Sequence, residues 1–488
     1  MSAYWIRKLA GLMLLGWACN GAAQVLTLER VLHSARIHTP TLLEAQAEFE
    51  MARGDRIAAD GRYDINVSQE NYNRFSGFYD GKISSTKVSQ RFLDYNSEVY
   101  AAYRVSDGDF PIYEDEFFTN GGGEIKLGVV FSLLQNRDFD SGRFALLSGR
   151  LKQDAAALNM QLQRVSVQFE AMTRYKEWLA AGLTLRAYQR LLDVAQERDQ
   201  AMRKRVAGGD LAEIFLVESQ QNILKRETLV NEAQRRFIQA AQRLSFYYRD
   251  TQGYPIVPES DEVPKRFPQI QDEVLRDIQS QISRMNELRP ELLLLENEIE
   301  KAQAELQLGE NLARPSWDVR LETARDFGDG SITRSGTDVI VGMKFSLPLE
   351  RSLAKGRIHT AKAKLKRLQY KQQRVSEQLL IEVNSIINDI RAAKRFMFLA
   401  AEEQIQATTL QSAEQIRFNN GDSDFFVLNL REERAADAAI RNIQAQARYF
   451  ISAAAYYAAT VQLDQFQLQA QLSTSQDSFD NVLSVYSE

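Results

Sequence analysis

The feature that most constrains this chain is an internal duplication, because residues 124–152 recur as residues 338–366. Gly128 and Gly342 lie 214 positions apart, and the same spacing relates the other identical positions of the two stretches. These are Phe131/Phe345, Ser132/Ser346, Leu133/Leu347, Arg137/Arg351, Gly142/Gly356, Arg143/Arg357, Leu151/Leu365 and Lys152/Lys366. The chain is therefore interpreted as two copies of one structural unit.

Each copy of this stretch begins with an alternating pattern of apolar and polar residues. The apolar positions are Ile125, Leu127, Val129, Phe131 and Leu133 in copy one, and Val339, Val341, Met343, Phe345 and Leu347 in copy two. Most positions between them are small or polar. A period of two over about nine residues predicts a strand with one apolar face and one polar face.

Composition argues against several classes of function. The net charge is -5 and 26% of the 488 residues are charged, so no basic field is present to recruit nucleic acid. The chain has three histidines, His33, His38 and His359, and a single cysteine, Cys19. These numbers leave no metal cluster, thiol nucleophile or disulfide framework, so neither a cofactor nor an enzymatic activity is predicted.

Residues 1–23 have the pattern of a secretory signal peptide. Arg7 and Lys8 precede an apolar core from Leu9 to Ala18, and small residues lead to a cleavage site near Ala23. A lipoprotein signal acylated on Cys19 is the alternative. No later stretch reaches the roughly 18 apolar residues of a membrane helix. If the exported chain crosses a membrane, we expect it to do so as a closed barrel.

Both copies repeat the order helix, strand, strand, helix, helix. The first helices begin at Pro40 and Pro290, where the missing N–H of proline costs nothing. The first strands are expected at residues 63–67 and 317–321, which are 254 positions apart. Since the second strands are 214 apart, copy one carries about 40 extra residues within the loop 74–123. This insertion is expected to form an added hairpin or a long surface loop.

The second strands lead into helices of unusual length. From Gly142 to about Val206 no proline occurs, and a helix of this length spans on the order of 90 Å. Apolar or small residues recur at alternating spacings of four and three, which is the pattern of the seam of a left-handed coiled coil. They are Leu151, Ala155, Leu158, Leu162, Val165, Phe169 and Met172 in copy one, and Leu379, Val383, Ile386, Ile390, Ala393, Met397 and Ala400 in copy two.

Both long helices are expected to end at matching turns 212 positions apart, Arg205-Val-Ala-Gly-Gly-Asp-Leu and Arg417-Phe-Asn-Asn-Gly-Asp-Ser. The glycine supplies a left-handed residue, and Asp210 or Asp422 can cap the return helix that follows. The return helices are expected at about 212–247 and 424–457.

The predicted organisation follows from these elements. It comprises a signal peptide at 1–23, repeat 1 at 24–254, a proline-rich crossover linker at 255–270, repeat 2 at 271–464 and an irregular tail at 465–488. The linker prediction depends on four prolines clustered between the copies, Pro255, Pro258, Pro264 and Pro268.

This arrangement resembles the TolC-like family of outer-membrane efflux and secretion channels. The resemblance covers about Leu26 to Leu463 and is carried by the doubled element order, the two Phe-Ser-Leu strand ends and the two Arg-x-x-x-Gly-Asp turns. It implies a mainly α fold with a membrane β-barrel, long antiparallel coiled-coil helices and internal duplication. Four strands per subunit would close a trimeric 12-stranded barrel in the outer membrane, and the helices would continue as a tunnel into the periplasm.

The resemblance also implies partners and sites. A homotrimer would dock a periplasmic adaptor (membrane fusion) protein that couples it to an inner-membrane ABC or proton-driven transporter, as in tripartite efflux or type I secretion. The docking turns would comprise Arg205, Gly208, Gly209 and Asp210, with Arg417, Gly421, Asp422 and Ser423. Leu211 stands where copy two has Ser423, so the two docking sites should differ. Candidates for the pore constriction are Glu403, Gln404, Thr408 and Gln411, and a ring of Glu403 side chains would favour cations.

The leading hypothesis is therefore a passive outer-membrane conduit from periplasm to exterior. One alternative is an exported coiled-coil structural or adaptor protein without a pore. Another is a periplasmic hydrolase using paired carboxylates of the insertion, such as Glu114, Asp115 and Glu116. Adjacent loop residues point in different directions and no nucleophile motif accompanies them, which argues against the hydrolase.

Overall fold

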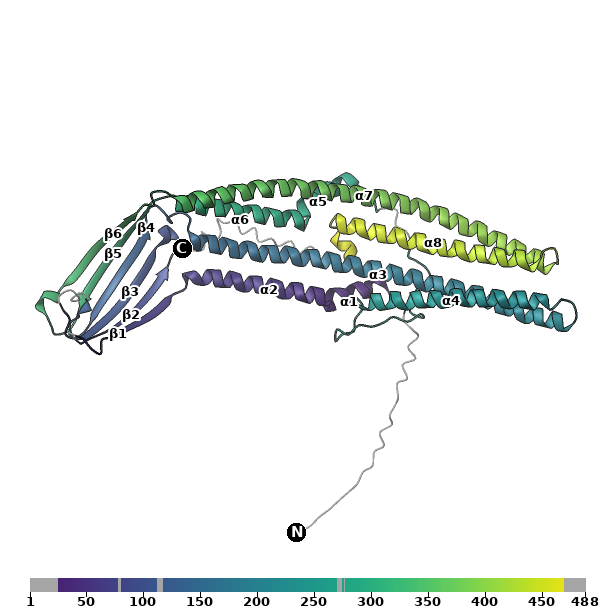
Figure 1. Cartoon of the computed structure of the whole chain (residues 1–488), viewed down its shortest axis with the longest axis horizontal. Coiled ribbons are helices and arrows are strands. Elements are labelled where there is room, and N and C mark those ends of the chain that lie inside the picture. The colour runs from purple at the N-terminus through teal and green to yellow at the C-terminus, as the bar shows by residue number, and fades with distance from the viewer. Residues whose placement is uncertain (1–24, 78–79, 112–116, 270–273, 276, 469–488) are drawn as a thin grey trace, which may run out of the picture. The chain divides into compact units, whose positions relative to one another are not determined.

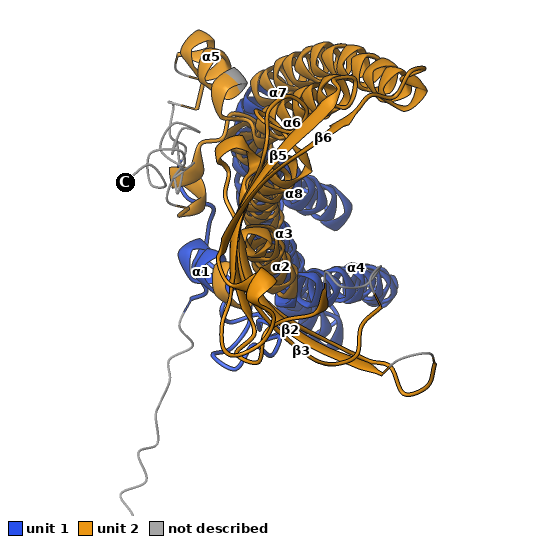
Figure 2. Cartoon of the chain, turned by 90° about the vertical axis from the view of Figure 1, so that its left-hand side faces the viewer, with its two compact units in different colours: residues 1–35, 171–271, 393–451 blue, residues 36–170, 272–392, 452–488 orange. Residues whose placement is uncertain are grey.

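The computed structural model describes residues 25–77, 80–111, 117–269, 274–275 and 277–468 (Figure 1). The predicted signal peptide with Cys19, the acidic residues Glu114, Asp115 and Glu116, and the predicted tail from 469 onward lie outside this set. The chain divides into two compact units (Figure 2). Unit 1 comprises residues up to 35, 171–271 and 393–451, and unit 2 comprises 36–170, 272–392 and the residues from 452. Each unit therefore takes residues from both sequence repeats.

The observed elements follow the doubled order. Copy one contains α1 (Leu28–His38), α2 (Pro40–Asp60), β1 (Asn66–Asn73), β2 (Gly81–Arg91), β3 (Glu98–Gly108), β4 (Glu124–Ser132), α3 (Ser141–Ala207) and α4 (Ile214–Ser245). Copy two contains α5 (Ile278–Leu288), α6 (Pro290–Leu312), β5 (Ser316–Asp326), β6 (Thr337–Ser346), α7 (Ser352–Asn419) and α8 (Phe425–Ala459). Short 3-10 segments connect several of them, such as Leu463–Phe466 after α8.

The sheet of unit 2 has six antiparallel strands in the order β1-β2-β3-β4-β5-β6, so the prediction of four strands per subunit is wrong. Strands β4, β5 and β6 lie where they were predicted, whereas β1 begins at Asn66, three residues later than predicted, because Gly61–Tyr63 form a 3-10 segment. The other two strands come from the insertion, which pairs as a hairpin between β1 and β4. Of the two forms predicted for the insertion, the hairpin is the one observed.

The helices of unit 2 begin and pack as their sequences indicate. Pro40 and Pro290 each occupy the start of a helix, α2 and α6. Leu295 and Ala302 of α6 pack with Leu368 of α7, all at most 2% exposed, and form an apolar contact between these helices. Such burial contributes on the order of 1.5–3 kcal/mol for each large side chain.

Unit 1 is a set of helices held together by aromatic and small residues. Trp178 of α3 is fully buried, and its ring lies 6.4 Å from the ring of Phe237 of α4. The Tyr175 hydroxyl donates a hydrogen bond of 2.9 Å to the carbonyl oxygen of Leu26, which joins the segment before α1 to α3. These contacts join α3 to α4 and to the segment before α1 within copy one.

The predicted seam of α7 is confirmed at most positions. Leu379, Val383, Ile390, Ala393, Met397 and Ala400 are buried, whereas Ile387 is buried in place of the predicted Ile386. In α3 the buried members of the predicted seam are Leu151, Leu158 and Met172. Within the described residues, none of the helices is apolar over a stretch long enough to span a bilayer.

Candidate functional site: a two-faced sheet and two helical turns

One face of the sheet is apolar and exposed. The residues paired across the strands include Val67 with Val88, Ala101 with Leu127 and Thr323 with Val339, so these side chains share one face. Val339, Met343 and Phe345 of β6 are 78%, 68% and 62% exposed. An apolar surface that continues over several strands is rare on a protein surrounded by water, and it marks contact with lipid or another protein.

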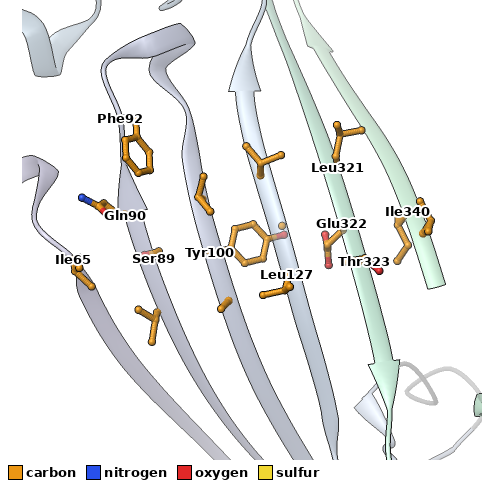
Figure 3. A pocket seen from close by; sticks show the side chains of 16 residues that line it. Ile65, Ser89, Gln90, Phe92, Tyr100, Leu127, Leu321, Glu322, Thr323 and Ile340 are labelled. Carbon is orange, nitrogen blue, oxygen red and sulfur yellow. The ribbon is translucent and has the colours of Figure 1, made fainter. Parts of the chain in front are cut away.

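A shallow hollow over the sheet is lined by residues of all strands except β1, together with Ile65 just before it (Figure 3). Leu127 and Leu321 lie in it, together with Val99 and Val339. Most of the lining side chains are aliphatic, and among the described residues no group of side chains suited to hold a metal ion is found. The hollow is therefore part of the apolar face.

The opposite face carries charged side chains that pair between neighbouring strands. The Nζ atom of Lys87 on β2 lies 2.9 Å from Oε1 of Glu98 on β3. Arg104 of β3 pairs with Glu124 of β4 at 2.9 Å, and Lys126 of β4 pairs with Glu322 of β5 at 3.0 Å. Charges gathered on one face while the other is apolar indicate that the sheet separates a wet side from a dry side.

A tyrosine on the polar face explains one of the duplicated glycines. Tyr100 of β3 is paired with Gly128 of β4, and its ring lies across that glycine toward Glu322 of β5 (Figure 3). A Cβ atom added at Gly128 would lie 2.4 Å from Cζ of Tyr100, which is too close for any side chain. At Gly342, the repeat equivalent, the nearest atom would be Cβ of Arg320 at 3.7 Å, so an alanine fits there.

The two predicted docking turns have the same backbone geometry. Gly209 and Gly421 both have φ of +81°, as the sequence predicted for a left-handed residue. The amides of Gly209 and Asp210 donate to the carbonyls of Val206 and Arg205, and the amides of Gly421 and Asp422 to those of Phe418 and Arg417. Both helices therefore end in a Schellman motif.

The side chains of the turns are open to solvent and differ between copies. Arg205, Gly208 and Asp210 are exposed, as are Arg417 and Asp422, while Ser423 is half-buried. Arg417 donates a hydrogen bond of 3.0 Å to the carbonyl oxygen of Asp422 and forms an ion pair of 3.2 Å with Glu414.

The predicted capping by Asp422 is wrong. Asp424 accepts the capping hydrogen bond of α8 instead, from the amide of Val427 at 2.8 Å. The residue before α4 is Glu213, whose side chain makes no capping hydrogen bond, so Asp210 is not the N-cap of α4. In both copies the helix begins later than the aspartate of the turn.

The constriction candidates lie on α7 opposite α8. Glu403 is paired with Arg441 of α8 at 2.6 Å, and this hydrogen bond lowers the pKa of the Glu403 carboxyl. Gln404 accepts a hydrogen bond of 2.6 Å from Asn442, and the Thr408 hydroxyl donates to the carbonyl oxygen of Gln404. Gln411 is half-buried. Glu403 thus has a positive partner within its own hairpin.

Sequence reasoning missed a buried ionic cluster in unit 1. Arg226 of α4 and Glu432 of α8 are 0% and 1% exposed, and the guanidinium lies 2.8 Å from the carboxylate. Arg198 of α3 also pairs with Glu432 and donates a hydrogen bond of 2.9 Å to Oδ1 of Asn429. Burial lowers the pKa of Arg226, and Glu432 opposes that effect.

This cluster ties α3 and α4 of copy one to α8 of copy two. The spacing of 212 makes Leu410 and Ala438 the repeat equivalents of Arg198 and Arg226, and Val217 and Gln220 the equivalents of Asn429 and Glu432. The charges of the cluster are therefore not repeated, and no local sequence pattern marks them.

No protein-family model and no curated protein matches the sequence. Solved structures do match it. The open state of the MtrE outer membrane channel of Neisseria gonorrhoeae is 14% identical with a TM-score of 0.62, over 89% of this chain and 88% of that chain. The CmeC outer membrane channel of Campylobacter jejuni is 12% identical with a TM-score of 0.62, over 94% and 88%. The outer membrane protein VceC of Vibrio cholerae is 14% identical with a TM-score of 0.61, over 89% and 95%.

These likenesses show that the chain has the fold of this class of outer-membrane channels. The predicted resemblance to the TolC-like channels is therefore confirmed for the mainly helical fold.

Proposed function

We propose that this protein is a passive outer-membrane channel through which cargo moves from the periplasm to the exterior. The single observation that carries the proposal is the sheet with an exposed apolar face and an ion-paired polar face. A sheet of this kind is stable where lipid covers one side and water the other. The fold shared with the channels CmeC and MtrE supports the same function.

A single copy does not enclose a pore, because its sheet is open. Among the described residues, the outer edges of β1 and β6 have no strand beside them. Unpaired backbone groups at an edge cannot remain exposed in hydrocarbon, so these edge strands need to pair with strands from other copies of the protein. We propose a homotrimer in which β6 of one copy pairs with β1 of the next.

The internal repeat supports this association in unit 1 as well. Within one chain, Arg198 of copy one meets Asn429 of copy two. The equivalent positions in the other copies are Leu410 and Val217, which are 49% and 64% exposed. Arg198 and Asn429 thus contact each other within one chain, whereas their apolar repeat equivalents are exposed. We propose that these apolar residues are covered in the trimer, where copy two of one chain packs against copy one of its neighbour.

The helical turns are proposed to dock a periplasmic adaptor that is coupled to an ABC or proton-driven transporter of the inner membrane. The two turns have the same backbone conformation and different side chains. They comprise Arg205, Gly208, Gly209 and Asp210 in copy one, and Arg417, Gly421, Asp422 and Ser423 in copy two. Glu403, Gln404, Thr408 and Gln411 are proposed to line the constriction near this end. Because Arg441 pairs with Glu403, we expect only weak cation preference in the natural channel.

Single-channel recording in a planar bilayer tests the function. Purified oligomer should give discrete conductance steps, and the oligomer should migrate as a trimer in mild detergent. A coiled-coil rod without a pore would instead behave as a monomer or dimer. A well-folded trimer without any conductance would contradict the channel.

A further inference from the structure

We infer that the β2–β3 hairpin is a segment of the barrel wall, so that three copies of the six-stranded sheet close an eighteen-stranded barrel. The inference rests on the proposed function and concerns the width of the pore in the outer membrane. The alternative is that the hairpin projects from a narrower wall of twelve strands.

The position of the hairpin supports the wider wall. β2 pairs with β1 from Asn66↔Ser89 to Asn73↔Lys82, and β3 pairs with β4 from Glu98↔Val130 to Arg104↔Glu124. The two inserted strands thus occupy the place between β1 and β4 along the whole of β1 and along seven of the nine residues of β4. A projecting hairpin would leave β1 and β4 free to pair with each other.

Copy two shows what that direct pairing looks like. There β5 and β6 are adjacent, with Arg320 opposite Gly342. The repeat places Asn66 at the position of Arg320 and Gly128 at that of Gly342. In the structure Gly128 faces Tyr100 of β3 instead, and the tyrosine ring fills the space above the glycine.

The hairpin also has the two faces of a wall. Val88, Val99 and Tyr103 lie on the apolar face and are 39%, 47% and 45% exposed. Lys87 and Glu98 lie on the polar face, where Arg104 pairs with Glu124 of β4. A loop surrounded by water has no physical reason to keep this alternation in register with β4.

The consequence is a wider outer pore. At equal strand tilt the diameter of a barrel grows roughly linearly with strand number, so eighteen strands give about 1.5 times the diameter of twelve. Barrels of 16–18 strands leave an aqueous channel. The inserted hairpin therefore increases the size of cargo that the outer-membrane part admits.

The chain supplies its own control for this inference. Replacing residues 73–122 with residues 327–336, the loop that joins β5 to β6, removes 40 residues and lets β1 pair with β4 as β5 pairs with β6. Electron microscopy of the two trimers, viewed along the barrel axis, should show a barrel diameter reduced by about one third in the variant. Equal diameters, or twelve strands in the natural trimer, would overturn the inference.

A second measurement uses the full chain and does not depend on the folding of the shortened variant. In lipid vesicles, a Val99→Cys variant should resist a water-soluble thiol reagent, as a Val339→Cys variant of β6 should. An Ala102→Cys variant, on the polar face of β3, should react. Rapid labelling of Val99→Cys with protection of Val339→Cys would place the hairpin in water and refute the wall segment. Lack of conductance in the natural trimer would instead refute the proposed channel, so the two failures are distinguishable.

Discussion

The helical hairpins α3–α4 and α7–α8 share one backbone design and differ in their charges. Their turns have the same φ value at Gly209 and Gly421 and the same hydrogen bonds. The arginines of the buried cluster, however, belong to copy one, and the carboxylate Glu432 belongs to copy two. Copy one thus supplies the cations of this cluster and copy two the carboxylate, so the two hairpins are complementary in charge at this contact.

The strands show the same divergence in packing. Gly128 lies beneath Tyr100, whereas a Cβ atom added at Gly342 would make only an ordinary contact of 3.7 Å with Cβ of Arg320. Identical residues in the two copies thus face different neighbours, because the insertion placed β3 next to β4. Conserving a residue between repeats does not conserve its energetic role.

The largest effect is expected from breaking the buried cluster. Glu432→Gln leaves Arg226 and Arg198 without a carboxylate partner in the interior, which costs about 3–5 kcal/mol. The midpoint of thermal unfolding, followed by circular dichroism in detergent, should fall sharply. The control is Glu403→Gln in the exposed pair with Arg441, which should change stability by about 1 kcal/mol or less. Equal effects of the two variants would contradict the buried cluster.

A smaller effect is expected from the paired glycines. Gly128→Ala forces Tyr100 away from its place beside Glu322 and should cost about 1–3 kcal/mol, as other overpacked sites do. Gly342→Ala should be neutral or stabilising by about 0.5 kcal/mol, because alanine fits there and restricts the unfolded chain. Thermal melting of the two purified variants measures the difference. If Gly342→Ala were the more harmful, a neighbouring copy would have to lie against that glycine.

The turn glycines test whether the two hairpins are equivalent in their backbones. Gly209→Ala and Gly421→Ala should each cost about 1–2 kcal/mol, because both residues have positive φ and neither Cβ would meet another atom within 4 Å. Their unfolding midpoints should agree, whereas binding of an adaptor should differ through Leu211 and Ser423. We also expect conductance to rise when either turn is loosened. Markedly unequal shifts of the unfolding midpoints would contradict the prediction and show that contacts outside the turn stabilise one of the two turns.

The smallest effect on stability, and a clear one on selectivity, is expected from Arg441→Gln. Removing the guanidinium frees the carboxylate of Glu403, so the ratio of cation to anion permeability should increase at neutral pH. The pKa of Glu403, which Arg441 lowers, should return toward its ordinary value. The added selectivity should therefore be lost as the pH falls through the ordinary carboxylate range. Reversal potentials in a salt gradient measure it, and an unchanged ratio would place Glu403 away from the pore.

Much of the fold could be predicted because it depends on local patterns. The stretch without proline that ends near Val206 predicted α3, and Pro40 and Pro290 predicted the starts of α2 and α6. The alternation of apolar and polar residues around Phe131 and Phe345 predicted β4 and β6. Each of these signals acts within a few residues along the chain. The left-handed conformation of Gly209 and Gly421 is of the same kind.

Other features left no clear signal in the sequence. Asp424 rather than Asp422 caps α8, because hydrogen bonds compete at the start of a helix and the sequence does not fix which of two nearby aspartates lies at the cap. Glu432 gave no signal of burial, because its partners Arg198 and Arg226 lie more than 200 positions away.

The sequence by itself determined that the chain is a duplicated unit of strands and long helices, since periodicity and helix-ending glycines are written locally. Only the tertiary structure decided that the insertion enters the sheet as two further strands and that charges of the two copies meet in the interior. Both outcomes arise from pairing between distant segments, where backbone hydrogen bonds and buried charges are satisfied by whichever partner the fold brings alongside.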